Sequence, residues 1–395
     1  MNSKKTVVVG MSGGVDSSVS ALLLKEQGFE VIGLFMQNWQ SEPGEVCTSE
    51  IDYKDAELVC DQLGIKLFRA NFSKDYWDKV FEEFLAEHKR GRTPNPDVLC
   101  NREIKFKSFR DYAIRIGADY IATGHYAALE NKDSKIYLKR AKDLNKDQTY
   151  FLHEVKSKDF ENTIFPLADL TKPEVRKIAD KHGLSNKDKK DSVGICFIGE
   201  RNMQDFLSRF ITLSEGDILD DKGVIIGKHQ GATLYTEGQR KGLHIGGVKN
   251  AKEEPWYVFK KDIERNLIYV CQGAENPLLF SKALKLDSLH CITDKVEDSM
   301  KCEVQIRHRQ TPVQCQLNPK TLEVVFDEPV SSVSPGQYAV FYTFAGRNAP
   351  LPVGPEEQVG KARAERPGDA QGTGWHQHPR LLRGGPCPGE QSEPL

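Results

Sequence analysis

Residues 10–18 read Gly10-Met-Ser-Gly-Gly-Val-Asp-Ser-Ser18, directly after the apolar run Thr-Val-Val-Val at residues 6–9. This order predicts a strand over Thr6–Gly10, a glycine-rich turn, and a helix over Ser17–Gln27. Glycines let the backbone amides of such a turn approach an anion closely, and hydroxyls beside the positive end of a helix dipole add further donors. The stretch therefore predicts a phosphate-binding loop.

The ending of this loop decides which phosphate chemistry to expect. It lacks the Gly-Lys-Ser/Thr sequence of the P-loop of nucleotide triphosphatases, so cleavage between the outer phosphates is not indicated. The Ser12-Gly-Gly-x-Asp-Ser17 arrangement instead resembles the pyrophosphate loop of ATP-dependent adenylating enzymes. A glycine-rich turn without a ligand is the alternative.

The first 200 residues alternate short apolar runs with amphipathic stretches, which indicates a parallel sheet covered by helices. We predict a doubly wound α/β nucleotide-binding domain over residues 1–211. Thr171-Lys-Pro-Glu174 has the form of a capping box that opens a helix ending at His182, where Gly183 can take the left-handed conformation. Further strands are expected at Val31–Met36, Lys66–Phe72 and Tyr120–Thr123, and further helices at Tyr53–Leu63 and Tyr76–His88.

After residue 212 the sequence changes to short β-prone runs separated by Gly, Asn and Pro, a spacing that favours small β domains. We expect a small central β-rich module over residues 212–274 and a C-terminal β-barrel over residues 275–345. The last 50 residues, 346–395, contain nine Gly and eight Pro but no Ile, Phe or Tyr. Such a segment cannot bury enough apolar surface to offset the entropy lost on ordering, so we expect a disordered tail.

The composition narrows the class of protein. Hydrophobic residues make up 38% of the chain, and no apolar run reaches the roughly 18 to 20 residues that a membrane-spanning helix needs. The N-terminus leads directly into the first predicted strand, which leaves no room for a signal peptide. We expect a cytoplasmic protein with no membrane segment, whose nine cysteines are reduced thiols.

The net charge of −2 does not by itself indicate nucleic-acid binding, so any RNA contact must come from local basic patches. Taken singly, each such patch is more typical of a solvated surface. The candidates are residues 89–92, Lys105 with Lys107 and Arg110, and residues 187–190, 240–241 and 307–309.

Ligands of open α/β sheets bind beyond the carboxyl ends of the strands, and this rule selects two further residues. Met36 ends the second predicted strand and could line an adenine, while Gly124 follows the strand at Tyr120 and would let a nucleotide lie close to the backbone. Core packing for Met36 and a plain turn at Gly124 remain open as alternatives.

Two cysteine motifs carry the remaining chemistry. In Arg92-Thr-Pro-Asn-Pro-Asp-Val-Leu-Cys-Asn101, two prolines restrict the backbone ahead of Asp97 and Cys100, so a carboxylate and a thiol are held in fixed relation. In residues 189–199, Lys-Lys-Asp-Ser-Val-Gly-Ile-Cys-Phe-Ile-Gly, the thiol of Cys196 follows several lysines, and nearby cations favour its thiolate.

Together with Gly-His-Tyr at Gly124, Lys-Asp-Gln at Lys146 and Gly-Gln-Arg-Lys-Gly-Leu at Gly238, these motifs resemble the tRNA-specific 2-thiouridylases over about residues 5–342. The resemblance implies that Cys100 is a nucleophile, that Cys196 carries a persulfide, and that the two form a transient disulfide. It implies ATP binding by Gly10, Met11, Ser12, Gly13, Gly14, Val15, Asp16, Ser17, Met36 and Gly124. It implies contact with the target base by Asn95, Pro96 and Asp97, and contact with tRNA by Lys146, Asp147, Gln148, Arg307 and His308.

The implied chemistry is adenylation of the 2-carbonyl oxygen of a wobble uridine, followed by sulfur delivery from the Cys196 persulfide to the activated carbon. Asp97 could shuttle a proton or orient the base. Mg²⁺ is expected to neutralise the phosphates. The expected partners are tRNA and a persulfide donor, either a cysteine desulfurase or a relay protein, and the enzyme is expected to be a monomer.

Two positions depart from the family pattern. Glu237 stands where the family has an apolar residue and is expected to place an unpaired charge against the core of the central module. After Tyr342 the family continues into a short final strand, whereas this chain enters the Pro/Gly tail, so the barrel is expected to be incomplete. The rival functions are a pyrophosphate-loop amidating synthetase, which needs no cysteine pair, and a catalytically silent RNA-binding protein.

Overall fold

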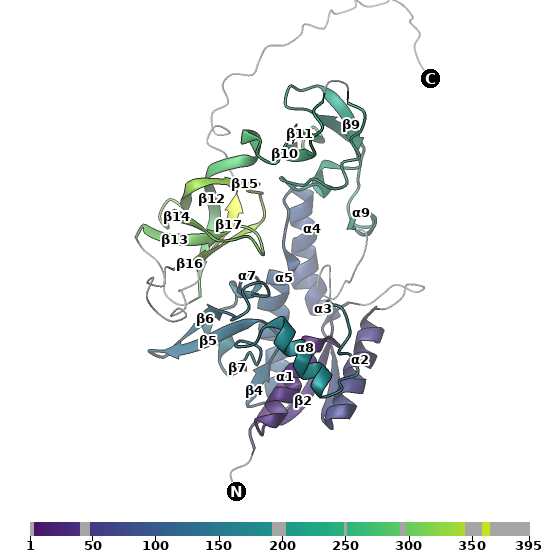
Figure 1. The fold of residues 1–395 in the computed structure, drawn as a ribbon, viewed down its shortest axis with the longest axis vertical. Coiled ribbons are helices and arrows are strands. Elements are labelled where there is room, and N and C mark those ends of the chain that lie inside the picture. Colours follow the sequence, from purple (N-terminus) through teal and green to yellow (C-terminus); the bar gives the residue numbers. More distant parts are fainter. Residues whose placement is uncertain are drawn as a thin grey trace, which may run out of the picture.

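The computed structural model describes residues 4–39, 48–191, 203–248, 251–292, 298–343 and 358–363. They form three bodies: a parallel α/β domain, a small central β domain, and a β-barrel (Figure 1). This arrangement confirms the predicted fold class. Within these residues, no helix is both long and apolar enough to cross a membrane.

The first domain is built on a five-stranded parallel sheet in the order β3-β2-β1-β4-β7. The chain winds outward from β1 in both directions, which places a topological switch point between β1 and β4. Ligands of open α/β sheets bind at this point. The strands are β1 (Thr6–Met11), β2 (Glu30–Gln37), β3 (Lys66–Asn71), β4 (Tyr120–Ala122) and β7 (Thr163–Ile164).

Alternation along β1 explains why helices cover both faces of the sheet. Val7 and Val9 point into one hydrophobic cluster and Val8 into the other, and all three are completely buried. The first cluster packs against α1 (Val15–Glu26), α2 (Thr48–Leu63) and α8 (Lys172–Lys181). The second packs against the helical segments α3 (Ser73–Tyr76), η1 (Trp77–Phe81), α4 (Glu82–Lys89), α5 (Pro96–Leu99), η2 (Cys100–Phe109) and α6 (Arg110–Arg115).

Helix α8 begins as predicted. The Thr171 backbone N–H and hydroxyl donate to Glu174 Oε2 at 2.6 and 2.8 Å, which completes a capping box. Gly183 follows the helix with a φ of +62°, the left-handed conformation expected at that position. The start of α8 is therefore fixed by local hydrogen bonds.

Smaller elements complete the first domain. A β5–β6 hairpin leads to a short helix that contacts the barrel. They comprise β5 (Ala127–Lys132), β6 (Lys135–Arg140), α7 (Thr149–Leu152), η3 (Ser157–Phe160) and, beyond residue 202, α9 (Met203–Leu207).

The central domain is a four-stranded sheet in the order β10-β11-β8-β9, and α4 rises toward it from the nucleotide domain (Figure 1). Its core is formed by Ile218, Val258, Ile268 and Val270, all completely buried. The elements are β8 (Gly216–Leu219), β9 (Ile225–His229), η4 (Ala232–Leu234), β10 (Trp256–Asp262) and β11 (Leu267–Gln272).

The third body is a closed barrel of six strands, in the order β12-β15-β14-β13-β16-β17. After the short turn η5 (Pro277–Leu279), its strands are β12 (Phe280–Cys291), β13 (Met300–Gln305), β14 (Val313–Asn318), β15 (Glu323–Ser331), β16 (Tyr338–Tyr342) and β17 (Gln358–Arg363).

The closing strand corrects the expectation of an incomplete barrel and, for residues 358–363 alone, that of a disordered tail. β17 lies inside the segment expected to be disordered, and it pairs with both β12 and β16, so the barrel is not incomplete. Composition averaged over 50 residues hides a six-residue strand. Such a strand needs only backbone hydrogen bonds to two strand edges that would otherwise stay unpaired.

Candidate active site

The predicted phosphate loop joins β1 to α1 as the sequence indicated. Gly14 is the N-cap of α1 and provides no side-chain cap, so the first-turn amides of the helix are available to an anion. Ser17 Oγ accepts a hydrogen bond from the Ser12 backbone N–H at 3.2 Å and donates to Gly14 O at 3.0 Å. The loop is thus preshaped by its own hydroxyl groups.

Two glycines permit close approaches around this loop. Gly13 has a φ of +73°, and a Cβ there would lie 2.3 Å from the Asp52 carbonyl oxygen. A Cβ at Gly124 would lie 2.8 Å from the Ser17 amide nitrogen. Gly124, which follows β4, therefore lies directly against the start of α1, and its predicted approach to a nucleotide stays a prediction.

The other predicted ATP residues surround the same edge of the sheet. A Cβ at Gly10 would lie 3.4 Å from Met36 Cε, so the ends of β1 and β2 are in contact. The side chains of Met11 and Val15 point into the cluster shared with α8, and that of Met36 into the opposite cluster. These three residues can offer a ligand their backbone more readily than their buried side chains.

Sequence reasoning missed several polar residues around the loop. Asn186 Nδ2 donates to Gly13 O and Ser18 Oγ, both at 2.9 Å, and these two hydrogen bonds stabilise the turn. Asn38, at the end of β2, is 1% exposed, and its amide has no hydrogen-bond partner within the part of the chain that the structure describes. Neither residue belongs to a recognisable local motif, although Asn38 follows Met36 closely enough that the carboxyl-edge rule could have included it.

An ion-pair network adjoins the loop at Asp16. Lys172 Nζ donates to both Asp16 carboxylate oxygens at 2.8 Å, and the Tyr126 hydroxyl donates to Asp16 Oδ1 at 2.9 Å. Burial, and next the Asp16 charge, raises the pKa of Tyr126 far above its usual range, so the phenol stays protonated. Tyr126 belongs to the Gly-His-Tyr motif, which could have pointed to it.

Asp191 extends this network. Burial disfavours its charge, but hydrogen bonds from Lys146 and Lys172 outweigh burial and hold the pKa of Asp191 well below its usual range. Its carboxylate oxygens lie 2.5 Å from Lys146 Nζ, 2.8 Å from Lys172 Nζ and 2.9 Å from Arg176 Nη2. Asp191 is therefore an ionised carboxylate shared by three cations.

The proline-rich motif forms the start of a helix. Asn95 is the N-cap of α5, and its Oδ1 accepts the Asp97 backbone N–H at 3.2 Å, with Pro96 in the first turn. Asp97 is half-buried, whereas Cys100 is completely buried. The motif thus opens a capped helix, and its thiol faces the protein interior.

The three domains meet immediately before this motif. Thr93 donates its N–H to Pro335 O at 2.9 Å, accepts Gln337 Nε2 on its carbonyl at 2.7 Å, and shares a 3.0 Å hydroxyl contact with Thr236. The neighbouring Gly91 carbonyl accepts Lys261 Nζ at 2.6 Å. Barrel and central domain are thus both attached to the segment that carries Asn95 to Cys100.

The predicted tRNA contacts around residue 147 make contacts within the protein. Asp147 accepts backbone N–H groups from Ala141 at 2.7 Å and Thr149 at 3.2 Å, and burial raises the pKa of Asp147. Gln148 Oε1 accepts the Tyr126 N–H at 3.0 Å, and Lys146 binds Asp191. This segment shapes the start of α7 and the edge of the Asp16 network.

The barrel pair Arg307 and His308 lies against other domains. Arg307 Nη2 donates to the Glu237 carbonyl, and to Ser332 O and Ser334 Oγ at 3.0 Å each, while burial lowers the pKa of Arg307. The His308 ring lies 4.4 Å from the Phe151 ring, between centroids. Arg307 therefore joins the barrel to the central domain.

The expectation that the Glu237 charge is unpaired is wrong. The residue is half-buried at this same junction, and its charge lies near Lys261 and Arg307. Burial lowers the pKa of Lys261 to about 8, and the Glu237 charge opposes that shift. An acidic residue is accommodated there because two cations face it.

Cys196, the predicted persulfide carrier, lies outside the described residues. The lysines ahead of it do not all remain unpaired: Lys189 Nζ binds Asp52 at 2.7 Å and Asp55 at 2.5 Å. The proposed partnership of Cys100 with Cys196 stays a prediction.

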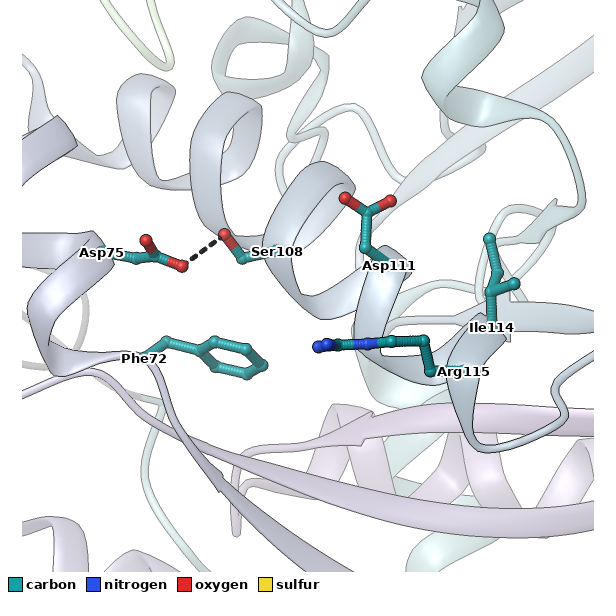
Figure 2. A pocket seen from close by; sticks show the side chains of 6 residues that line it. All are labelled: Phe72, Asp75, Ser108, Asp111, Ile114 and Arg115. Carbon is teal, nitrogen blue, oxygen red and sulfur yellow. Dashed lines mark hydrogen bonds between the residues drawn. The ribbon is translucent and has the colours of Figure 1, made fainter.

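A cavity of about 390 Å³ lies beyond the end of β3, away from the phosphate loop. Figure 2 shows the Asp75 carboxylate accepting a hydrogen bond from the Ser108 hydroxyl, and the Arg115 side chain extending toward the Phe72 ring. Lys79 Nζ also lies 2.9 Å from Asp75 Oδ1, and this hydrogen bond is the main reason that the pKa of Asp75 is lowered. None of the predicted site residues lines the cavity, so we do not assign the reaction to it.

The residues near the loop suit a magnesium ion that arrives with phosphate. Among the described residues, no group of three or more His, Cys, Asp or Glu could hold a metal ion without such help. Mg²⁺ commonly binds through one or two carboxylates together with substrate phosphates, and Asp16 beside the phosphate loop fits that mode.

Comparisons with known proteins cover most of the chain. Family models described as a tRNA methyl transferase HUP domain, a tRNA methyl transferase PRC-barrel domain and an aminomethyltransferase beta-barrel domain match residues 5–200, 204–272 and 281–347. The tRNA-specific 2-thiouridylase MnmA of Pseudomonas aeruginosa (strain UCBPP-PA14) is 53% identical over 344 residues, covering 86% of this chain and 92% of the relative.

The MnmA protein of Proteus mirabilis (strain HI4320) is 52% identical over 347 residues, covering 86% of this chain and 95% of the relative. Among solved structures, the U34-tRNA thiolase NcsA from Methanococcus maripaludis is 21% identical, with 52% of this chain and 63% of that chain covered and a TM-score of 0.33.

Proposed function

The chain belongs to the tRNA-specific 2-thiouridylase family, and we propose that it uses ATP to replace the 2-carbonyl oxygen of a tRNA wobble uridine with sulfur. The observation that carries this proposal is one hydrophobic cluster that includes residues from both predicted halves of the site. Met36, at the end of β2 beside the phosphate loop, and Cys100, in the base motif, belong to one hydrophobic cluster. One continuous core thus supports both the nucleotide edge and the motif for the base.

In the first step the chain holds ATP at the start of α1. The first-turn amides and the hydroxyls of Ser12 and Ser17 bind phosphate oxygens, and Gly124 lets the end of β4 pack closely against the start of α1. The uridine 2-carbonyl oxygen attacks the α-phosphorus, pyrophosphate leaves, and an AMP ester replaces a poor leaving group. Asp97, half-buried at the start of α5, accepts a proton or orients the base.

In the second step sulfur enters. The Cys100 thiolate attacks the inner sulfur of a persulfide on Cys196, so a Cys100–Cys196 disulfide forms and hydrosulfide leaves. Hydrosulfide adds to the activated carbon and AMP departs with the original oxygen. A thiol reductant then supplies two electrons to restore both cysteines.

Cys100 is completely buried, so this step requires that the side chains covering it move before the thiol can meet a persulfide. Adenylation needs no thiol and can precede that movement. The proposal further includes Mg²⁺ carried by ATP, a cysteine desulfurase or relay protein as sulfur donor, and a monomeric enzyme in the cytoplasm, where reduced thiols persist.

The test supplies the full chain with unmodified tRNA, ATP, Mg²⁺ and a persulfide donor, and analyses the nucleosides by mass spectrometry. We expect 2-thiouridine with the wild type and none with Cys100→Ser or Cys196→Ser, although both variants should still release pyrophosphate. Cys291→Ser is the matched control, because Cys291 is a half-buried thiol on β12 in the barrel and should behave like the wild type.

Three outcomes would point elsewhere. An aminated nucleoside formed from ammonia would indicate an amidating synthetase. Binding of tRNA without pyrophosphate release would indicate a silent RNA-binding protein. Thiolated tRNA alongside two free, unlinked cysteines after one turnover without reductant would mean that Cys100 and Cys196 are the wrong pair.

A further inference from the structure

Lys172 reaches the phosphate loop from a distant part of the chain. It opens α8, where its backbone N–H donates to Asp143 Oδ2 at 2.9 Å and the Thr171–Glu174 capping box fixes the turn. Figure 1 shows α8 beside α1, and the two helices share one hydrophobic cluster. The lysine is therefore held in a defined position relative to the start of α1.

The ammonium group of Lys172 lies between two carboxylates. Its Nζ is 2.8 Å from both oxygens of Asp16 and 2.8 Å from Asp191 Oδ1. The Lys172 side chain is only 11% exposed, compared with 32% for Asp16 and 36% for Asp191. Because Asp16 lies in the first turn of α1, this buried cation adjoins the helix end that is available to an anion.

We propose that Lys172 supplies, from α8, the phosphate-binding cation that the Gly10–Ser18 loop itself lacks, and that its ammonium binds a phosphate oxygen of ATP. The inference rests on the proposed use of ATP. In ordinary P-loops a lysine within the loop meets the outer phosphates, and no lysine stands in residues 10–18. Asp16 then acts as a positioning residue that aims the ammonium group.

The network allows Lys172 to turn toward a phosphate without leaving a carboxylate unpaired. If Lys172 turns away, Asp191 retains its ion pairs with Lys146 and Arg176, and Asp16 retains the hydrogen bond from the Tyr126 hydroxyl. A buried ion pair seldom stabilises a fold more than well-packed apolar side chains do, so stability alone gives little reason for a lysine here. An anionic ligand bound nearby would give a direct reason for a lysine at this position.

The test compares the binding of ATP with that of adenosine, each in the presence of Mg²⁺, by titration calorimetry on the full chain. Lys172→Met should weaken ATP binding by about 10- to 100-fold, the range expected for one charged hydrogen bond, and leave adenosine binding unchanged. Lys172→Arg keeps the charge and should lose less. Lys142→Met is the control, because within the described residues the Lys142 ammonium binds Glu174 alone, at 3.3 Å, and the side chain is 46% exposed.

Each result is decisive. Unchanged ATP binding by Lys172→Met, or equal weakening of ATP and adenosine, overturns the inference in favour of a purely structural lysine. If Lys172→Met does not fold, the Asp16→Asn/Lys172→Met double variant, which leaves no unpaired Asp16 charge, is compared with Asp16→Asn alone, and the loss of ATP binding between these two variants is judged in the same way. A wild type that binds no ATP would overturn both this inference and the proposed function, whereas absent thiolation with intact ATP discrimination would overturn only the latter.

Discussion

Gly124→Ala offers the sharpest test of how the phosphate loop is supported. A methyl group there would place its Cβ 2.8 Å from Ser17 N and 2.9 Å from Asp16 C. These distances fall short of the 3.4 Å at which ordinary contact begins, so strand end or helix must move by about 0.6 Å. Both atoms belong to the backbone of the first turn of α1, so no flexible side chain can absorb the clash.

Both neighbours of the clash are also firmly packed. Helix α1 is buried through Val15 and Val19, and Ala122 at the end of β4 is completely buried. We therefore expect Gly124→Ala to lower the free energy of unfolding by about 1–3 kcal/mol, the usual effect of overpacking. A displaced phosphate loop should also slow pyrophosphate release by roughly 10- to 100-fold, since misplacements near 1 Å have effects of that order.

Urea unfolding and pyrophosphate release in the presence of tRNA measure the two effects. Gly246→Ala is the control, because among the described residues, its two chain neighbours aside, no heavy atom would lie within 4 Å of a Cβ there. Gly10→Ala tests the same site without a clash, since its nearest neighbour, Met36 Cε, would be 3.4 Å away. Wild-type stability and rate in Gly124→Ala would refute the close approach of β4 to α1.

Three further perturbations follow from the contacts. Thr171→Ala should lower stability by about 0.5–2 kcal/mol in urea, because it removes the α8 cap, and a value near zero would contradict the capping box. Arg307→Ala should lower stability by about 1–3 kcal/mol, since it leaves buried acceptors at the domain junction unpaired; a weaker salt dependence of tRNA binding would show that the guanidinium also meets a phosphate. Burial lowers the pKa of His88 to about 4 in the folded protein. The free energy of unfolding should therefore decrease as the pH falls from about 6.5 toward 4. In urea titrations over that pH range, His88→Gln should lose less stability than the wild type.

Local patterns predicted the elements that hold the phosphate loop. The apolar run before Gly10 and the glycines after it place β1 and α1 within two residues of their observed bounds. The capping box at Thr171 can be predicted from a stretch of only four residues, Thr171 to Glu174. Such signals succeed because the hydrogen bonds that define these elements join residues close in sequence.

Long-range pairings could not be predicted in the same way. Lys172 and Asp16 are 156 residues apart, and no local sequence pattern around either residue predicts that the two form an ion pair. The family resemblance implies a tRNA contact for Arg307, which stays a prediction, but the sequence does not indicate that its guanidinium donates to acceptors of the central domain and the barrel. β17 was missed because its pairing depends on the free edges of β12 and β16.

Apart from the hydrophobic cluster that they share, the two halves of the site are held by different polar contacts. The phosphate loop is held by α8 through Lys172 and by Asn186, all within the first domain. The base motif instead follows Thr93, whose backbone and hydroxyl bind the barrel and the central domain. A change at the domain junction, such as Arg307→Ala, should therefore disturb the base and sulfur steps while leaving ATP binding intact, because no contact described at that junction reaches the loop.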